Sequence, residues 1–265
     1  MTDPSVPLYL IFPFLDEGPN IPQLLKDIEA FAEVHPEYLV KVLAVDDGSR
    51  DGGGELLRRH RGVCSVEVIV NPSNLGPGAS FARAFARLAE RMGKDALVVT
   101  MEADNTSGLE TLAHMLVRLK EGYEVVLASP YCYGGGFSQV SLCRAVLSHL
   151  ANGLVKVLLA LRGLNTFSSF FRLYRSGTIR RLQATYGPGI IDSPGFECMI
   201  ELLYKLVLLE ATISEVEFRL DWSVRQGKSK MKIVRTAIGY LRVFSSRRRW
   251  QKASQPRHRE NTEKF

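Results

Sequence analysis

The stretch Ala44-Val45-Asp46-Asp47-Gly48-Ser49-Arg50-Asp51-Gly52 decides how the rest of the sequence is interpreted. It closes the apolar run 40–45, so a buried strand is predicted to present two adjacent carboxylates, Asp46 and Asp47, where it ends in a loop. The two glycines let that loop turn, and a Ser or Asp within it can cap the next helix. Ligands bind at this edge of an open α/β sheet. Taken alone, the stretch fits equally well a capped turn that binds no ligand.

A second apolar segment, 98–104, also ends in two acids, Glu102 and Asp104. Residues two positions apart lie on the same side of an extended chain, so both carboxylates are expected to point the same way. A hard divalent cation in a protein keeps waters and uses one or two carboxylates together with substrate phosphates. The two strand ends therefore indicate a site for a metal and a nucleotide diphosphate.

Composition and charge narrow the functional classes. A chain of 265 residues is long enough for one large α/β domain, and 46% hydrophobic with 23% charged residues excludes general disorder. Lys and Arg crowd the region after Arg225 and culminate in Arg247-Arg248-Arg249. Within the basic tail that begins at Arg247, Trp250 is the one aromatic residue interleaved with the basic side chains, so nucleic-acid binding is disfavoured.

Cysteine spacing and hydropathy bear on the compartment. The cysteines lack a metal-ligand spacing and predict free thiols in a reducing compartment; they are Cys64, Cys132, Cys143 and Cys198. The first residues show no secretory signal, and no apolar run reaches the length of a membrane span. The apolar stretch 154–164 is short and contains Lys156 and Arg162. These patterns predict a cytoplasmic protein without a spanning helix, although they leave contact with a membrane surface open.

Strand-like and helix-like segments alternate through the first half of the chain. Expected strands are 8–14, 40–45, 66–70, 98–104 and 125–129, and expected helices are 21–31, 55–61, 79–92 and 108–120. This βαβ alternation predicts a Rossmann-like, mostly parallel sheet with helices on both faces. The turn 71–79 before the third helix either directs N–H groups at a phosphate or simply makes a tight turn.

The second half has a different character. Residues 140–161 are expected to form a long apolar helix, and 213–220 alternates like an antiparallel edge strand. Residues 231–244 form an amphipathic basic helix that lies either in a membrane interface or against the domain. We predict one domain over 1–231, this helix over 232–252, and a disordered tail over 253–265.

Several motifs resemble those of glycosyltransferase family 2 and occur in the same order. The early ones are Pro13-Phe14-Leu15-Asp16-Glu17-Gly18-Pro19-Asn20-Ile21, the stretch Val45 to Gly52, Asn74-Leu75-Gly76-Pro77-Gly78-Ala79 and Met101-Glu102-Ala103-Asp104. The later ones are Ser169-Phe170-Phe171-Arg172-Leu173-Tyr174, Gly195-Phe196 with Glu201-Leu202-Leu203-Tyr204, and Arg225-Gln226-Gly227-Lys228-Ser229-Lys230. Within the family, the sequence is most similar to the polyprenyl- and dolichyl-phosphate sugar transferases of the dolichol-phosphate mannose synthase type.

The resemblance implies a GT-A type fold, Mg²⁺ or Mn²⁺ as cofactor, and roles for individual residues. Metal ligands are Glu102 and Asp104. The nucleotide sugar is expected at Pro13, Asp16, Glu17, Asp46, Asp47, Gly76, Glu102 and Ala103. The acceptor phosphate is expected at Arg144, Ser148, Arg172, Arg225 and Lys230, of which Arg225 and Lys230 join Asp104 as catalytic residues.

The acceptor determines whether a general base is needed. A hydroxyl must lose a proton during attack, whereas a phosphomonoester is already largely dianionic because its second pKa is about 6. Arginine forks match phosphate oxygens, so the cationic set fits a phosphate acceptor. Asp192 and Glu201 remain available as bases for a hydroxyl acceptor, and a non-catalytic nucleotide-sugar binder is a third reading.

The expected reaction is therefore an inverting hexose transfer from a nucleotide sugar, GDP-mannose or UDP-hexose, to dolichyl or undecaprenyl phosphate. The expected place is the cytoplasmic face of a membrane, with a small membrane subunit as a conceivable partner. The chain departs from its family at Glu102, where the metal motif usually has Asp, at Pro130, where it usually has Arg, and at Phe170, where it usually has Gly.

Overall fold

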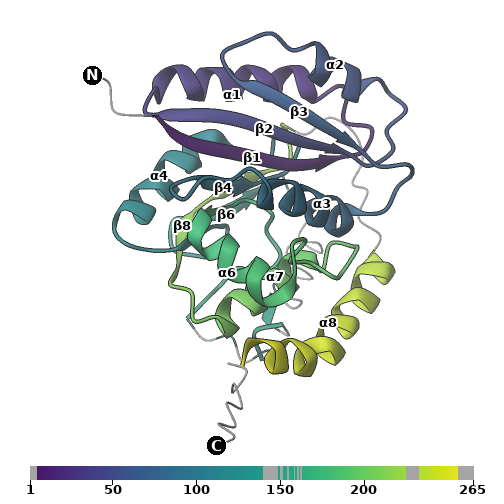
Figure 1. Cartoon of the computed structure of the whole chain (residues 1–265), viewed down its shortest axis with the longest axis vertical. Coiled ribbons are helices and arrows are strands. Elements are labelled where there is room, and N and C mark those ends of the chain that lie inside the picture. The colour runs from purple at the N-terminus through teal and green to yellow at the C-terminus, as the bar shows by residue number, and fades with distance from the viewer. Residues whose placement is uncertain are drawn as a thin grey trace, which may run out of the picture.

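The computed structural model describes residues 5–139, 149, 152–153, 155–157, 159, 161, 163–224 and 233–255. A seven-stranded sheet in the order β3-β2-β1-β4-β7-β5-β8 runs through the molecule (Figure 1). Its strands are β1 (Val6–Phe14), β2 (Tyr38–Asp46), β3 (Ser65–Val70), β4 (Leu97–Thr100), β5 (Val125–Ser129), β7 (Arg172–Arg175) and β8 (Ile213–Glu217). The shorter strands β6 (Gly136–Ser138) and β9 (Arg219–Asp221) pair with each other.

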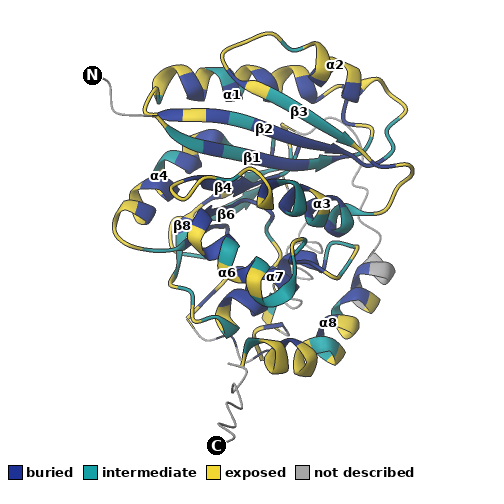
Figure 2. Ribbon diagram, in the orientation of Figure 1, coloured by how far each residue is buried: buried dark blue, intermediate teal, exposed yellow. Residues whose placement is uncertain are grey.

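Helices cover both faces of the sheet, as the alternation of the sequence predicts. They are α1 (Ile21–Val34), α2 (Gly53–Arg59), α3 (Pro77–Ala89), α4 (Leu109–Lys120), α6 (Ser176–Tyr186), α7 (Cys198–Leu208) and α8 (Ile233–Ser254). One apolar core joins α1, α2 and α4 to one face of the sheet, and a second core joins α3, α6, α7 and α8 to the other. Figure 2 shows that buried residues lie along the central strands, whereas the edge strand β3 is intermediate to exposed and the helices expose their outer surfaces. The predicted mostly parallel α/β sheet is confirmed.

The position of the antiparallel strand differs from the prediction. Alternation over 213–220 predicted an antiparallel edge strand, but β8 lies at the edge and pairs in parallel with β5. The antiparallel strand is β7, which lies inside the sheet between β4 and β5. An alternating pattern reports one half-exposed face and carries no information about strand direction, so the pattern could not distinguish these arrangements.

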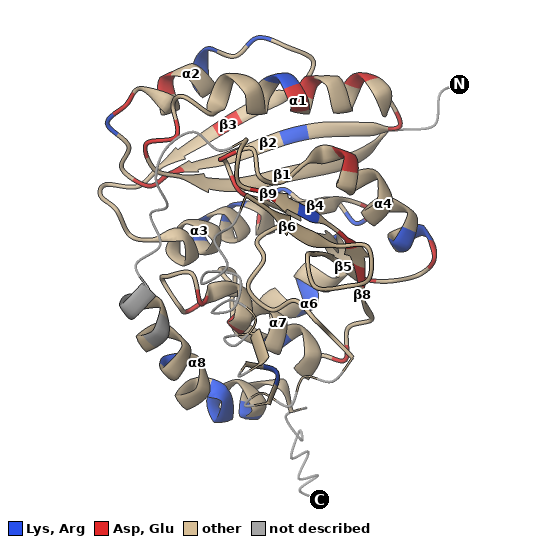
Figure 3. Ribbon diagram, turned by 180° about the vertical axis from the view of Figure 1, so that it is seen from behind, with Lys and Arg blue, Asp and Glu red and all other residues tan. Residues whose placement is uncertain are grey.

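The C-terminal helix α8 packs on the domain through one face and exposes another. Thr236, Val243 and Trp250 are buried, whereas Ile238 and Leu241 are 48% and 67% exposed. Figure 3 shows Lys and Arg along the same helix. The helix continues to Ser254, two residues beyond its predicted end, and residues 256–265 of the predicted tail lie outside the described part. Among the described helices, none combines the length and the apolar character that crossing a membrane requires.

Candidate active site at the carboxyl edge of the sheet

Three loops meet where the neighbouring parallel strands β2, β1 and β4 end. Hydrogen bonds join the first two loops, from Asp16 N to Ser49 Oγ at 3.0 Å and from Gly18 N to Asp51 Oδ2 at 2.5 Å. The third loop is joined through Asn105, whose Nδ2 donates to Asn20 O at 3.2 Å. The acidic ends of separate strands are thus held together at one edge of the sheet, which is where open α/β sheets bind ligands.

The metal-ligand candidates Glu102 and Asp104 lie together on the loop after β4. The Ser107 hydroxyl donates to the Glu102 carboxylate, and the Phe170 N–H donates to it at 3.4 Å. The Thr106 hydroxyl and amide donate to Asp104 Oδ1 at 2.5 and 3.3 Å. Removal from water and the neighbouring Asp104 charge raise the pKa of Glu102 to about 7. Two acids that repel each other in this way would be stabilised by a cation.

A divalent metal fits this donor set. Carboxylate oxygens suit Mg²⁺ and Mn²⁺, and such ions complete their coordination with water and substrate phosphates. Within the described residues, no group of three or more His, Cys, Asp or Glu side chains forms a complete metal cage. Glu102 and Asp104 fit a cation whose remaining ligands are water and substrate phosphates.

Asp47 has a structural role that the sequence did not reveal. Its Oδ1 accepts hydrogen bonds from Asn71 Nδ2 at 2.7 Å and Leu75 N at 2.8 Å, and its Oδ2 accepts one from Gly76 N at 2.9 Å. The predicted nucleotide ligand Asp47 thus shapes the 71–76 loop with both oxygens. The neighbouring Asp46 accepts from Ser49 N at 2.7 Å.

The glycines before α3 are packing positions. Gly76 N donates to Asp47, and Gly78 N donates to Pro194 O at 2.8 Å. A Cβ on Gly76 would collide with Pro194 O, and one on Gly78 with Ser193 O. Because these N–H groups already have protein acceptors, the structure favours the tight turn over the phosphate cradle at this helix start.

The remaining donor-site candidates lie around the same edge. Asp16 adopts a positive φ of 48° and accepts from Arg50 N at 2.8 Å. The buried Glu17 accepts from Asn20 Nδ2 at 2.5 Å. Pro13 lies near the end of β1 opposite Val45, and the Ala103 side chain is buried in the core. Of this set, Asp16 and Glu17 lie on the loop that faces the Glu102–Asp104 loop through Asn105.

Arg172 was predicted as an acceptor-phosphate ligand, and the structure contradicts that role. It is fully buried within β7. Its guanidinium donates to Ser169 O at 2.8 Å, Met199 O at 2.8 Å and Phe167 O at 2.7 Å. An arginine that satisfies three backbone carbonyls inside the protein has no surface on which to hold a lipid phosphate.

An ionic cluster under α8, which the sequence did not reveal, combines a buried pair with half-exposed groups. Lys205 is buried and contacts Glu201 at 2.6 Å and Asp192 at 3.3 Å. Asp192 Oδ2 also accepts from Arg249 at 2.6 Å and from Trp250 Nε1 at 3.0 Å, so it fastens α8 to the domain. The spacing of Glu201 and Lys205, four residues apart on one helix, was the available signal.

The family model for glycosyl transferase family 2 matches residues 9–182, which include the three loops and both metal-ligand candidates. The chain belongs to glycosyl transferase family 2. The resemblance seen in the motifs is therefore confirmed, and the chain is a glycosyltransferase by family.

Two relatives of this family 2 chain are informative. Polyprenol monophosphomannose synthase of Mycolicibacterium smegmatis is 28% identical over 232 residues, covering 86% of this chain and 82% of the relative. Undecaprenyl-phosphate 4-deoxy-4-formamido-L-arabinose transferase of Pseudomonas paraeruginosa is 29% identical over 119 residues. That match covers 44% of this chain and 33% of the relative, so the chain spans only about a third of that longer enzyme.

Solved structures support the family 2 fold. Mannosyl-3-phosphoglycerate synthase from Rubrobacter xylanophilus superposes with a TM-score of 0.62 at 19% identity, over 97% of this chain and 78% of the other. The mannosyltransferase PcManGT from Pyrobaculum calidifontis, in complex with GDP-Man and Mn²⁺, gives a TM-score of 0.53 at 15% identity. That match covers 96% of this chain and 74% of the other. At these identities the likeness establishes the GT-A fold.

The acceptor-site predictions for this family 2 chain stay predictions. Arg144, Ser148, Arg225 and Lys230 lie outside the described residues. The family match ends at residue 182, before Arg225 and Lys230.

Proposed function

We propose that this family 2 protein transfers a hexose from a nucleotide diphosphate sugar to a polyprenyl phosphate at a membrane surface. The observation that supports this most strongly is the Glu102–Asp104 acid pair at the carboxyl edge of a GT-A sheet. A relative named polyprenol monophosphomannose synthase, aligned over 86% of the chain, adds the lipid class. The identity of the donor, GDP-mannose or UDP-hexose, stays a prediction of the resemblance.

On the donor side, Glu102 and Asp104 would hold Mg²⁺ or Mn²⁺ against the diphosphate. When bound, such a cation neutralises the charge that develops on the leaving phosphate. The protein residues orient the donor, because the Asp16–Glu17 loop and the Glu102–Asp104 loop are tied to each other through Asn105 and Asn20. Ser107 and Thr106 hold the two carboxylates in place by hydrogen bonds.

On the acceptor side, a lipid phosphate oxygen would attack the anomeric carbon while the bond from that carbon to the diphosphate breaks. No proton has to be removed, since the phosphate is largely dianionic near neutral pH. The two carboxylates considered as bases for a hydroxyl acceptor are engaged elsewhere. Glu201 is fully buried against Lys205 and accepts from the amides of Asp192 and Ser193, and Asp192 holds α8. This observation favours the phosphate acceptor.

The outer face of α8 supports binding to a membrane surface. The helix buries Val243 and Trp250 and leaves Ile238 and Leu241 exposed. Exposed basic residues follow them along the helix, including Arg242, Arg248 and Lys252. Aliphatic side chains beside arginines and lysines match the apolar boundary and anionic headgroups of a membrane interface. A cytoplasmic location and a small membrane subunit are further predictions.

Lipid-phosphate transfer is tested directly by incubating the purified protein with Mn²⁺, radiolabelled GDP-mannose or UDP-glucose, and a short polyprenyl phosphate. We expect label in the organic phase with one of the two donors. The matched control is the corresponding polyprenol, which lacks the phosphate and should accept no sugar. Transfer to the polyprenol, or to water-soluble glycan alone, would contradict the proposal.

Membrane binding is tested separately by sedimentation with vesicles that contain anionic lipid. Replacing Ile238 and Leu241 by Asp should reduce the bound fraction, because both side chains are exposed and neither supports the core. Replacing the exposed Val34 and Val63 by Asp is the matched control on another part of the surface. Equal sedimentation of both double variants would exclude α8 as the contact.

A further inference from the structure

Phe170 lies just before β7, at a position where the sequence departs from the family motif. Its ring is buried, with 7% exposed, and it contacts two other rings. The ring of Phe81, from α3, meets it edge-on, with 5.3 Å between the centroids and 90° between the planes. The ring of Phe196, two residues before α7, stacks on it at 5.7 Å and 15°. Aromatic pairs prefer both arrangements, so these contacts fix the segment around Phe170 against α3 and the start of α7.

The backbone of Phe170 is tied to the end of β4. Its carbonyl oxygen accepts a hydrogen bond from the Thr100 hydroxyl at 2.6 Å, and its N–H donates to Glu102 Oε1 at 3.4 Å. Thr100 and Glu102 are two residues apart, so both polar groups of one peptide segment meet the strand end that carries the metal-ligand candidates. The bond to Glu102 is longer than the usual distance of about 2.9 Å, so a small shift of the segment would break it.

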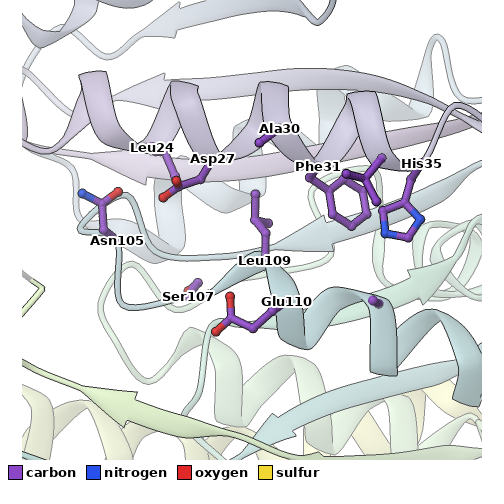
Figure 4. Close-up of a pocket in the computed structure, with 12 residues that line it drawn as sticks. Leu24, Asp27, Ala30, Phe31, His35, Asn105, Ser107, Leu109 and Glu110 are labelled. Carbon is purple, nitrogen blue, oxygen red and sulfur yellow. The ribbon is translucent and has the colours of Figure 1, made fainter.

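The other oxygen of Glu102 is held from a different segment. The Ser107 hydroxyl donates to Glu102 Oε2. Figure 4 shows Ser107 on the loop before α4, beside the pocket between α1 and α4. Each carboxylate oxygen thus receives one donor, and an ionised carboxylate can accept further ligands, including a cation. Of the two donors, the Phe170 amide is the one whose position depends on aromatic packing.

The next residue, Phe171, offers an internal comparison. Consecutive residues of an extended segment point to opposite faces of a sheet, and the Phe171 ring packs in the opposite core from that of Phe170. There it meets the ring of Phe218 at 5.8 Å and 75°. The Phe171 amide donates to Ser169 Oγ at 3.2 Å, whereas the Phe170 amide donates to Glu102. The two residues make similar ring contacts and differ in their connection to the metal-ligand candidate.

We propose that Phe170 is a positioning residue for the metal site. Its ring, held by two neighbouring rings, directs its amide at Glu102 and keeps that carboxylate in place for a divalent cation that binds with the nucleotide diphosphate. This inference rests on the proposed function, because it takes Glu102 as a metal ligand. Phe170 acts through Glu102 and is not itself a ligand.

The test measures how much Mn²⁺ the protein needs to bind nucleotide, without an assay of sugar transfer. Methylanthraniloyl-labelled GDP and UDP are titrated with the full-length protein at a series of Mn²⁺ concentrations, and the Mn²⁺ concentration for half-maximal binding is determined. Phe170→Leu keeps an apolar side chain but removes the ring contacts. It should raise that concentration about fivefold, the loss expected for one hydrogen bond.

Phe196→Leu tests the same contact from the other side and leaves Phe170 in place. It should raise the required Mn²⁺ concentration in the same direction. The double variant should need no more Mn²⁺ than Phe170→Leu alone, because both substitutions break one stacked pair and their effects are therefore not additive.

Phe218→Leu is the matched control, since it removes the corresponding ring contact in the other core. Phe170→Leu and Phe218→Leu should both lower the melting temperature by several degrees, because each leaves unfilled space in a packed interior. Phe218→Leu should nevertheless need the same Mn²⁺ concentration as the original protein. A role in stability alone would affect both variants equally.

Two results would overturn this inference and leave the proposed function standing. The first is an unchanged Mn²⁺ requirement in Phe170→Leu, or in Phe196→Leu if Phe170→Leu does not fold. The second is an equal rise of that requirement in Phe218→Leu. A different result, nucleotide binding by the original protein that needs no Mn²⁺, would overturn the metal assignment of the proposed function and this inference with it.

Discussion

Glu102 is partly buried and Glu201 is fully buried, and the surroundings of these two acids differ in charge. Glu102 lies near a second acid, Asp104, whose charge adds to the effect of burial and raises the pKa of Glu102 to about 7. Glu201 lies 2.6 Å from the ammonium group of Lys205, with Asp192 and Arg249 extending the cluster. We propose that a cation from outside completes the first pair, whereas the second already contains its own cation, Lys205.

This difference in charge favours a catalytic role for the Glu102 pair and a structural role for the Glu201 cluster. A like-charged pair costs free energy until a cation binds, so it is suited to recognising a metal with its nucleotide. In the buried pair of Glu201 and Lys205, each charge already has a partner. This pair fixes the position of the backbone around it. Glu201 accepts from the Asp192 and Ser193 amides, and the next carbonyl, that of Pro194, accepts from Gly78 at the start of α3.

The largest effect is expected for Asp104→Asn. Losing one carboxylate of the like-charged pair should lower turnover about 1,000-fold, or about 4 kcal/mol of transition-state stabilisation, with the melting temperature nearly unchanged. Steady-state transfer rates with Mn²⁺ measure this. Asp95→Asn, an exposed acid just before β4, is the control. Near-normal turnover of Asp104→Asn would remove it from the metal site.

Lys205→Met should destabilise the protein while leaving the metal site intact. Removing one partner of a buried pair strands the other charge, which costs about 3–5 kcal/mol of unfolding free energy. Urea denaturation measures the loss, and the exposed Lys120→Met should show almost none. Adding Glu201→Gln should recover part of the stability. A loss below about 1 kcal/mol for Lys205→Met would mean that the cluster does not hold the fold.

Trp250→Phe tests whether the cluster of Glu201, Lys205 and Asp192 holds α8 on the domain. The ring contact with Tyr204, 6.3 Å between centroids, is largely kept, but the hydrogen bond from Nε1 to Asp192 is lost. We expect about 1–2 kcal/mol of destabilisation in urea. Tyr133→Phe, which removes a hydroxyl from a fully exposed ring, serves as control. Unchanged stability would show that the Trp250 hydrogen bond contributes nothing.

The smallest expected effect is a change in how the stability of the protein depends on pH. Burial alone would raise the pKa of Asp192, but the hydrogen bond from Trp250 and the charges of Lys205 and Arg249 outweigh it and lower that pKa below the ordinary 3.8. The ionised carboxylate therefore contributes stability above pH 3.8, and this contribution is lost as the pH falls through the lowered value.

In Asp192→Asn, the free energy of unfolding should accordingly fall less steeply as the pH decreases. The expected contribution is only a few tenths of a kcal/mol, because Asp192 is half exposed and its interactions are screened. Urea midpoints measured from neutral pH to below the ordinary carboxyl pKa provide the test. Parallel curves for the variant and the original protein would show that another acid controls this range.

The sequence predicted the donor half of the fold well because its signals are local. Apolar runs ended by Asp46 and by Glu102 identify parallel strands whose ends share an edge, and the structure brings those ends together. The structural role of Asp47 could not be predicted from the sequence, since its partners Asn71 and Gly76 lie 24 and 29 residues away. A carboxylate that folds a loop and one that binds a ligand have the same local pattern.

The fold of the second half of the chain could not be predicted from the sequence for a similar reason. β7 is only four residues long and begins and ends with arginine, so it carries no apolar run. Arg172 looks like a phosphate ligand in sequence, yet its three carbonyl partners come from residues 167, 169 and 199. The cluster of Asp192, Lys205 and Trp250 forms only when α8 returns to α7, which no local pattern encodes.

The like-charged pair at Glu102 and Asp104 is proposed to require a cation that arrives with a nucleotide. Thermal unfolding with GDP or UDP, in Mn²⁺ or in EDTA, measures this directly. At a hundredfold excess over Kd, nucleotide binding should add about 2.7 kcal/mol of stability in Mn²⁺. We predict a rise in melting temperature only with metal and nucleotide together, and its loss in Glu102→Gln with Asp104→Asn. An equal rise in EDTA, or in the double variant, would contradict the account.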